Sequence, residues 1–153
     1  MRSQTGRTHG LLANLQMETA MQSAAFVNSA PRTISWTGRS LSTLVILFMV
    51  FDGVIHVVKP APVVEAFAQL GYPLSAAVGL GIVELACVVL YAVPRTAVLG
   101  AVLLTAYLGG AVATQLRIGA GAFPVVFPVI VGVLLWSGLA LRDARVRALI
   151  SSR

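Results

Sequence analysis

Long apolar runs, separated by short connections that carry charge, proline or glycine, make up most of the chain after a polar N-terminal segment. Because an α-helix rises about 1.5 Å per residue, roughly 20 apolar residues cross a hydrocarbon core of about 30 Å. Four runs have this length, and the pattern predicts an all-α four-helix transmembrane bundle. We place the spans at about Ser40–Val58, Leu74–Val93, Thr96–Leu116 and Phe123–Leu141.

The N-terminal segment is polar, rich in Ser, Thr and Gln, and lacks a sustained apolar period. Such segments cannot bury enough apolar surface to fold. We therefore expect residues 1–38 to form a disordered cytoplasmic tail, residues 39–150 the transmembrane domain, and residues 151–153 a short C-terminal tail. No apolar core of suitable length follows the early arginines, so a secretory signal is not expected.

Short connections predict how the helices are arranged. Val93-Pro94-Arg95 alone joins the second run to the third, and residues 117–122 join the third run to the fourth. Helices joined by such short loops are antiparallel neighbours. An up-down antiparallel bundle is the simplest topology.

The connection between the first and second runs is longer and contains a helical pattern of its own. Pro62 suits a helix start, and Gly71 suits the residue after a helix end. Val63, Phe67 and Leu70 recur at helical spacing between them. We expect a short interfacial helix here, lying flat on the membrane surface.

Composition agrees with a protein that lies in lipid. The chain is 58% hydrophobic and 10% charged, against roughly 45–50% and about 25% in soluble domains. Lipid replaces the polar exterior that this composition cannot supply.

The net charge of +6 is unevenly placed and predicts orientation. Nine of the eleven basic residues fall before the first span, between the second and third, or after the fourth, and only Lys59 and Arg117 fall on the other side. The positive-inside rule then puts both termini in the cytoplasm. A nucleic-acid partner is not expected, because aromatic residues are not interleaved with this charge.

A lone cysteine and a set of small residues limit the chemistry of the spans. Cys87 excludes an intrachain thiol pair. Small residues four positions apart allow helix backbones to approach closely, and Gly109-Gly110 is interpreted as part of such a packing surface rather than a ligand loop. These residues are Ala77 and Gly81 in the second run, and Ala106, Gly110 and Thr114 in the third.

Three ionisable residues fall inside the spans, where each is costly without a partner and is a candidate site: Asp52, His56 and Glu84. Asp52 and His56 are four residues apart and share one helix face. Counting from the middle of each span puts the two carboxylates at similar depth, so we expect them to meet and to share a proton.

Other polar residues extend this layer. His56 is expected near the outer headgroups, with Gln115 and Arg117 at similar depth, and Tyr107 and Thr105 supply mid-membrane hydroxyl groups. A proton path through these groups and interhelical hydrogen bonding that fixes register are equal alternatives, and Arg117 is expected to snorkel. A metal site is not expected, because one intramembrane histidine and one aspartate provide at most two ligands.

Several short motifs, in order over about residues 40–150, resemble the DoxX-like family of small bacterial membrane proteins. They are Phe51-Asp52-Gly53-Val54, Lys59-Pro60, Leu70-Gly71-Tyr72-Pro73, Gly81-Ile82-Val83-Glu84-Leu85, Tyr91-Ala92-Val93-Pro94-Arg95-Thr96, Leu99-Gly100-Ala101, the run from Tyr107 to Thr114, Trp136-Ser137-Gly138-Leu139, and Leu141-Arg142-Asp143.

The resemblance implies a four-helix membrane bundle in a bacterial inner membrane. For some members of the wider group it also implies thiosulfate:quinone oxidoreduction or membrane redox assemblies. It also implies that Asp52, Glu84, Arg95 and Arg117 match residues that family members carry. Position 115 departs from the pattern, since Gln115 stands where the resemblance implies histidine, and His56 is not implied by it.

The leading hypothesis is a membrane subunit of a redox or stress-response assembly that binds a quinone-like apolar molecule near Asp52, Glu84 and Tyr107. The sequence carries no electron carrier, so a redox partner protein or the substrate would deliver electrons. A noncatalytic assembly or lipid-interacting protein and a small proton-coupled transporter are the alternatives. The expected surroundings are the lipid bilayer, and a homo-oligomer, in which a second copy of the chain is the partner, is possible. The sequence does not decide whether the chain is an enzyme.

Overall fold

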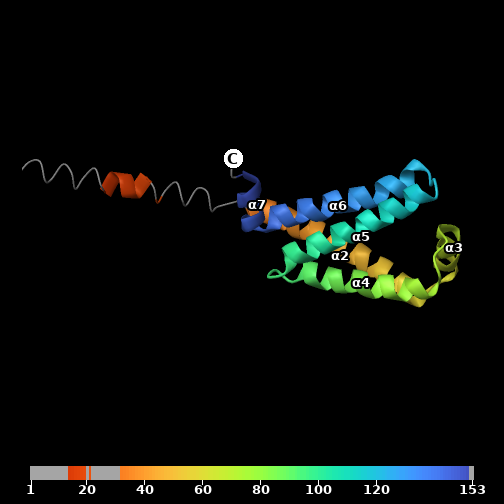
Figure 1. Cartoon of the computed structure of the whole chain (residues 1–153). Coiled ribbons are helices and arrows are strands. Elements are labelled where there is room, and N and C mark those ends of the chain that lie inside the picture. The colour runs from red at the N-terminus through yellow and green to blue at the C-terminus, as the bar shows by residue number, and fades with distance from the viewer. Residues whose placement is uncertain (1–13, 20, 22–31, 152–153) are drawn as a thin grey trace, which may run out of the picture.

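The computed structural model describes residues 14–19, 21 and 32–151, and these residues are mostly helical with no strand among them. Four of the described helices are long, and Figure 1 shows the long helices lying along one another in an elongated bundle. The elements are α2 (Arg32–Val58), α3 (Ala61–Leu70), α4 (Ser75–Ala92), α5 (Ala97–Arg117), α6 (Ala122–Arg142) and α7 (Ala144–Ser151).

The four predicted membrane spans are confirmed as helices. Within the described residues, α4, α5, α6 and the Trp36–Val58 part of α2 are long and apolar enough to cross a membrane. Many large apolar side chains on these helices are exposed on the outside of the bundle, as expected where lipid is the solvent. The protein is an integral, multi-pass membrane protein.

Part of the predicted tail is helical, which differs from the disorder expected there. Residues 14–19 and 21 are helical, and α2 begins at Arg32 rather than near Ser40. Leu15, Gln16 and Glu18 are good helix formers, and residues 32–38 extend a helix that the span has already nucleated. The rest of the tail lies outside the described residues, so disorder there stays a prediction.

The long helices form a closed ring with the predicted up-down order. The helix α2 packs on α4 and α6, and α5 packs on the same two helices. The bundle therefore has two distinct ends (Figure 1). We call the end with α7 and the α4–α5 connection the termini end, and the end with α3 and the α5–α6 connection the α3 end.

The short helix predicted between the first two spans is present as α3, and its ends follow the predicted rules. Pro62 lies in its first turn, and Gly71 after its last residue has a φ of 68°, in the left-handed region. The Gly71 N–H donates to the Ala68 carbonyl and the Tyr72 N–H donates to the Phe67 carbonyl, which is a Schellman motif. Figure 1 shows α3 lying across the end of the bundle, crosswise to the long helices.

The half of the bundle near the termini end is densely packed around a buried tyrosine. The Tyr91 hydroxyl donates to the Leu135 carbonyl at 2.8 Å and lies 3.1 Å from the Ser42 hydroxyl. Arg142 donates to the Tyr91 carbonyl at 2.7 Å, and its guanidinium lies 4.6 Å from the Tyr91 ring centroid. We call Ser42, Tyr91, Leu135 and Arg142 the Tyr91 cluster. It joins α2, α4 and α6.

Candidate functional site

The helices α2 and α4 approach each other most closely where two glycines face each other. A Cβ atom on Gly81 would lie 2.6 Å from the Gly53 carbonyl oxygen, and a Cβ atom on Gly53 would lie 2.8 Å from Leu85 Cγ. Neither position has room for a side chain, so the predicted packing role of Gly81 is confirmed. This contact places Asp52 and His56 of α2 beside Glu84 of α4.

Asp52, His56 and Glu84 lie close together. We call these three residues and Tyr107 the polar cluster. Donor atoms of the first three residues all lie within 4.8 Å of one another. His56 Nδ1 is 3.5 Å from Asp52 Oδ2 and 3.8 Å from Glu84 Oε2, and it is 2.8 Å from the Asp52 backbone oxygen. The two carboxylates therefore lie close together, as expected, whereas a proton shared between them stays a prediction.

Glu84 is the most deeply buried member of the polar cluster. It is 0% exposed, whereas the side chains of Asp52 and His56 are 32% and 20% exposed. The Tyr107 hydroxyl donates to Glu84 Oε2 at 2.8 Å. Glu84 Oε1 has no hydrogen-bond partner among the described residues. A buried carboxylate oxygen without a partner is costly and marks an incomplete network.

A cavity of about 640 Å³ lies in the α3 half of the bundle, beside the polar cluster. All four long helices, α3 and Tyr72 contribute to its walls. Its polar lining includes Asp52, His56, Tyr107 and Gln115, whereas Glu84 lies behind these side chains and does not line it. The rest of the wall is largely apolar and aromatic, with Phe48, Phe67, Phe123 and Phe127.

The small residues of α5 line this cavity, which corrects the packing role predicted for them. Ala106, Gly110 and Thr114 all lie in its wall. A Cβ atom on Gly110 or on Gly109 would meet nothing within 4 Å. A row of small residues can leave space for a ligand as well as allow a helix to approach, and the sequence pattern does not distinguish the two.

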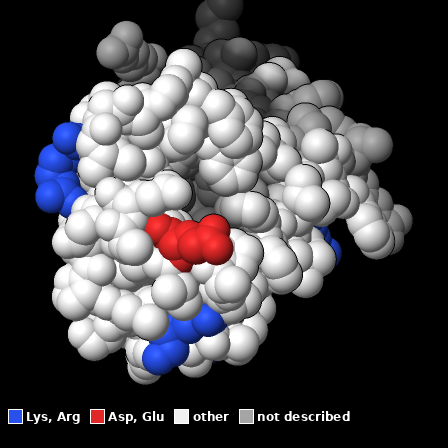
Figure 2. Space-filling view, turned by 90° about the vertical axis from the view of Figure 1, so that its right-hand side faces the viewer, with Lys and Arg blue, Asp and Glu red and all other residues white. Residues whose placement is uncertain are grey.

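The link that follows α3 closes over the cavity at the α3 end. Arg117 donates to the Leu70 carbonyl, and its guanidinium lies 5.2 Å from the Tyr72 ring centroid. The Tyr72 hydroxyl is 3.3 Å from the Thr114 hydroxyl. Phe67 packs edge-on against the His56 ring, with centroids 5.8 Å apart. Figure 2 views this end and shows a largely uncharged surface, with acidic atoms near its centre and separate basic patches.

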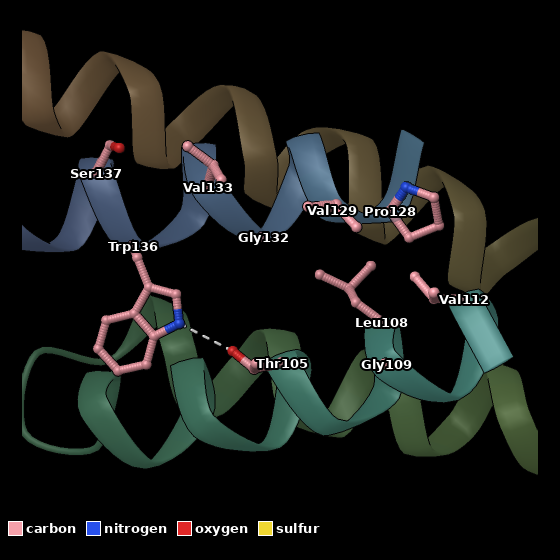
Figure 3. A pocket seen from close by; sticks show the side chains of 10 residues that line it. All are labelled: Thr105, Leu108, Gly109, Val112, Pro128, Val129, Gly132, Val133, Trp136 and Ser137. Atoms are coloured by element: carbon pink, nitrogen blue, oxygen red, sulfur yellow. Dashed lines mark hydrogen bonds between the residues drawn. The ribbon is translucent and has the colours of Figure 1, made fainter. Parts of the chain in front are cut away.

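A second hollow, of about 450 Å³, lies between α5 and α6 on another side of α5. Figure 3 shows Leu108 and Val112 of α5 facing Pro128 and Val129 of α6, with Gly132 further along α6. The one hydrogen bond drawn there runs from Trp136 Nε1 to the Thr105 hydroxyl, at 2.9 Å. This α5–α6 groove has no ionisable side chain in its lining.

The comparison with known families decides which proteins the chain resembles. The model of the DoxX-like family matches residues 40–138. The chain belongs to the DoxX-like family. Neither the search of curated proteins nor the search of solved structures gave a match. In this DoxX-like protein, the matched region contains every member of the polar cluster.

The polar cluster of the DoxX-like protein contains some predicted site residues and not others. Asp52, His56, Glu84 and Tyr107 are brought together. Thr105, predicted as a hydroxyl partner, lies instead in the α5–α6 groove, where its hydroxyl donates to the Ala101 carbonyl. Helical periodicity turns Thr105 and Tyr107 toward different sides of α5, which explains this difference.

One further expectation changes. The count of at most two metal donors was too low, because Glu84 adds a third donor from α4. Arg117 contacts Leu70 and Tyr72 and does not line the cavity, whereas Gln115 does, and snorkelling of Arg117 stays a prediction. Gly53 and Phe67 belong to the site but were not predicted to. Their roles depend on which residues face them from other helices, and the sequence alone does not show this.

Proposed function

We propose that this DoxX-like protein binds a quinone-like molecule in the 640 Å³ cavity, as a membrane subunit of a redox or stress-response assembly. One observation carries the proposal: a largely apolar cavity has its ionisable groups concentrated at Asp52 and His56, next to the Tyr107 hydroxyl. Small-molecule sites have this character and volumes of about 300–1,000 Å³. The apolar wall suits an apolar ring and tail.

The chemistry of the polar cluster suits a carbonyl compound that takes up and releases protons. A protonated carboxyl group, an imidazole or a phenol can donate to a quinone carbonyl. Tyr107 has one such hydroxyl at the cavity, and it donates to Glu84, which lies behind the wall. A protonated Glu84 can pass a proton through the Tyr107 hydroxyl to a quinone carbonyl in the cavity. The chain has a single cysteine and no thiol pair of its own, so a redox partner protein or the substrate itself would supply the electrons.

The orientation that belongs to this proposal has both termini in the cytoplasm of a bacterial cell. Arg95 and Arg142 lie at the termini end, and Lys59 and Arg117 lie at the α3 end. With the N-terminal and C-terminal arginines, nine basic residues belong to the first end and two to the second, which favours a cytoplasmic termini end. The cavity then lies in the outer half of the membrane.

Binding of a soluble quinone analogue to the purified full-length protein in lipid nanodiscs tests the proposal. We expect decylubiquinone to bind to the unaltered protein, and the double variant Asp52→Asn, Glu84→Gln to bind it at least about tenfold more weakly, since a hydrogen bond to a charged group contributes about 1.5–3 kcal/mol. Calorimetry measures the affinity, and thermal unfolding in the same nanodiscs measures stability.

A matched control separates the cavity from the α5–α6 groove. Thr105→Val alters a polar group of the groove and none of the cavity, so it leaves decylubiquinone binding unchanged if the cavity is the site. Unchanged binding by the double variant, with lowered thermal stability, would overturn the proposal. The polar cluster would then serve only to hold α2 and α4 in register, as the noncatalytic alternative requires.

A further inference from the structure

Three potential metal ligands converge from two helices of the polar cluster. Asp52 and His56 of α2 and Glu84 of α4 place one donor atom each within 4.8 Å of the other two. The distances from His56 Nδ1 to the nearest carboxylate oxygens are 3.5 Å and 3.8 Å. Donors that share a tetrahedral metal at bond lengths of about 2.1 Å lie about 3.4 Å apart. Small side-chain movements therefore bring the three donors to a common centre.

The buried Glu84 carboxylate supplies a second, independent indication of a ligand. Its side chain is 0% exposed, Oε2 accepts from Tyr107, and Oε1 has no partner among the described residues. Two carboxylates at this depth are costly in lipid unless their charge is balanced. Arg117 does not supply this balance, because its contacts are with Leu70 and Tyr72. Glu84 Oε2 lies 3.8 Å from His56 Nδ1, whereas the unpartnered atom is Oε1. A divalent cation held by Asp52 and by both oxygens of Glu84 would give a neutral centre and a partner for Oε1.

We propose that Asp52, His56 and Glu84 bind a divalent transition-metal cation, with Tyr107 orienting Glu84 through its hydrogen bond. A mixed set of imidazole and carboxylate donors suits Zn²⁺, Mn²⁺, Fe²⁺ or Co²⁺ better than Ca²⁺ or Mg²⁺, which prefer oxygen ligands. Binding through Nδ1 replaces the 2.8 Å contact of His56 with the Asp52 backbone oxygen and puts the imidazole proton on Nε2.

The proposed metal centre has room for a further ligand on one side. Three protein ligands leave at least one coordination position open, as in catalytic zinc sites. Asp52 and His56 line the cavity, so a ligand in that position would come from the cavity. The metal site goes beyond the quinone proposal and does not depend on it.

Metal titration of the full-length protein tests this proposal. The protein is purified in detergent, stripped with a chelator and titrated with Co²⁺ alone, whose visible absorption reports coordination, and Zn²⁺ is then added in competition. We expect stoichiometric Co²⁺ binding that Zn²⁺ reverses. His9, the other histidine of the chain, is replaced by Gln in every sample so that it makes no contribution.

Variants assign the ligands. His56→Gln, Asp52→Asn and Glu84→Gln should each weaken Co²⁺ binding by about 100-fold or more, and Tyr107→Phe, which removes only the supporting hydroxyl, by about 10-fold. Glu65→Gln is the matched control, because it removes one exposed carboxylate from α3 and should leave the affinity unchanged. Equal Co²⁺ binding by the His9→Gln protein and by the same protein with His56→Gln added would overturn the proposal.

X-ray absorption of the Zn²⁺-loaded unaltered protein keeps the test independent of whether a variant folds. One imidazole nitrogen and carboxylate oxygens around the metal support the site, and a shell without nitrogen, or no stoichiometric Zn²⁺, overturns it. No quinone is present in these measurements. Failure of metal binding therefore leaves the quinone proposal to its own titration, and failure of quinone binding leaves the metal proposal to this one.

Discussion

The Tyr91 cluster and the polar cluster both join α2 to neighbouring helices through buried polar groups, yet they differ in completeness. In the Tyr91 cluster, the tyrosine hydroxyl has two partners, and the Arg142 guanidinium contacts both the carbonyl and the ring of Tyr91. In the polar cluster, Glu84 Oε1 is the one buried side-chain polar atom of the described residues without a hydrogen-bond partner. Only the polar cluster borders the 640 Å³ cavity.

This difference separates a structural network from a candidate binding site. A buried network in which each group has a partner rigidifies a fold and leaves nothing for a ligand to add. An unsatisfied buried carboxylate beside a cavity lowers stability unless something else completes its contacts. We infer that the termini half of the bundle is built for stability and that the α3 half gives up some packing for binding.

The largest expected effect is in the Tyr91 cluster. Tyr91→Ala removes a fully buried ring and both of its hydroxyl hydrogen bonds. We expect the free energy of unfolding in mixed detergent micelles to fall by about 3 kcal/mol. This value is near the low end for loss of a buried aromatic ring, because unfolding within an apolar phase does not expose the ring to water. Tyr72→Ala, at the half-exposed α3 end, is the control and should cost about 1 kcal/mol or less. Equal losses would remove the contrast between the two halves.

A second effect comes from the glycine contact that positions the polar cluster. Gly81→Ala puts a Cβ atom 2.6 Å from the Gly53 carbonyl oxygen, so α2 and α4 must separate. We expect a loss of about 1–3 kcal/mol of unfolding free energy, together with weaker Co²⁺ and decylubiquinone binding. Gly110→Ala is the matched control, because the same substitution there adds a Cβ atom that meets nothing within 4 Å. It should change the free energy of unfolding by about 0.5 kcal/mol or less. A Gly110→Ala loss as large as that of Gly81→Ala would contradict the assignment of open space at α5.

The hydroxyl groups of the two clusters give a smaller and more direct comparison. Tyr91→Phe removes two hydrogen bonds and leaves the Leu135 carbonyl without this donor. Hydrogen bonds inside membrane proteins contribute about 0.6 kcal/mol each on average, so we expect a loss of about 1 kcal/mol and no change in ligand binding. Tyr107→Phe should cost about half as much, because the Tyr107 hydroxyl donates one hydrogen bond, to Glu84, and it should weaken metal binding. Denaturant titration of both variants measures the difference, and the reverse order would contradict it.

Much of the fold follows from apolar run length, because a membrane allows few structures. The apolar runs, the Pro62 start and the Gly71 end of α3, and the short α4–α5 connection were each predictable from local chemistry, and the family match is consistent with them. The start of α2 was not, because the residues before Trp36 are polar and their helicity depends on the span that follows.

The candidate site was predictable only in part. An ionisable residue inside a span is costly enough to be noticed singly, which identified Asp52, His56 and Glu84. The third metal donor, the cavity at Ala106 and Gly110, and the cover formed by Phe67 all depend on which helix faces which. Sequence periodicity gives the face of one helix, but it does not give the rotation of two helices relative to each other.

The smallest expected effect on stability is the sharpest test of the comparison. Glu84→Gln keeps the shape of the side chain, and its amide oxygen can still accept from Tyr107. It also removes a charge that has no complete set of partners. The change in unfolding free energy should therefore be within about 0.5 kcal/mol in either direction, even though Glu84 is as buried as Tyr91. Chelator-treated protein is used, so that bound metal does not stabilise only the unaltered chain. If Glu84→Gln instead loses as much stability as Tyr91→Ala, the carboxylate is a structural group like the tyrosine, and the polar cluster has no surplus bonding capacity to offer a ligand.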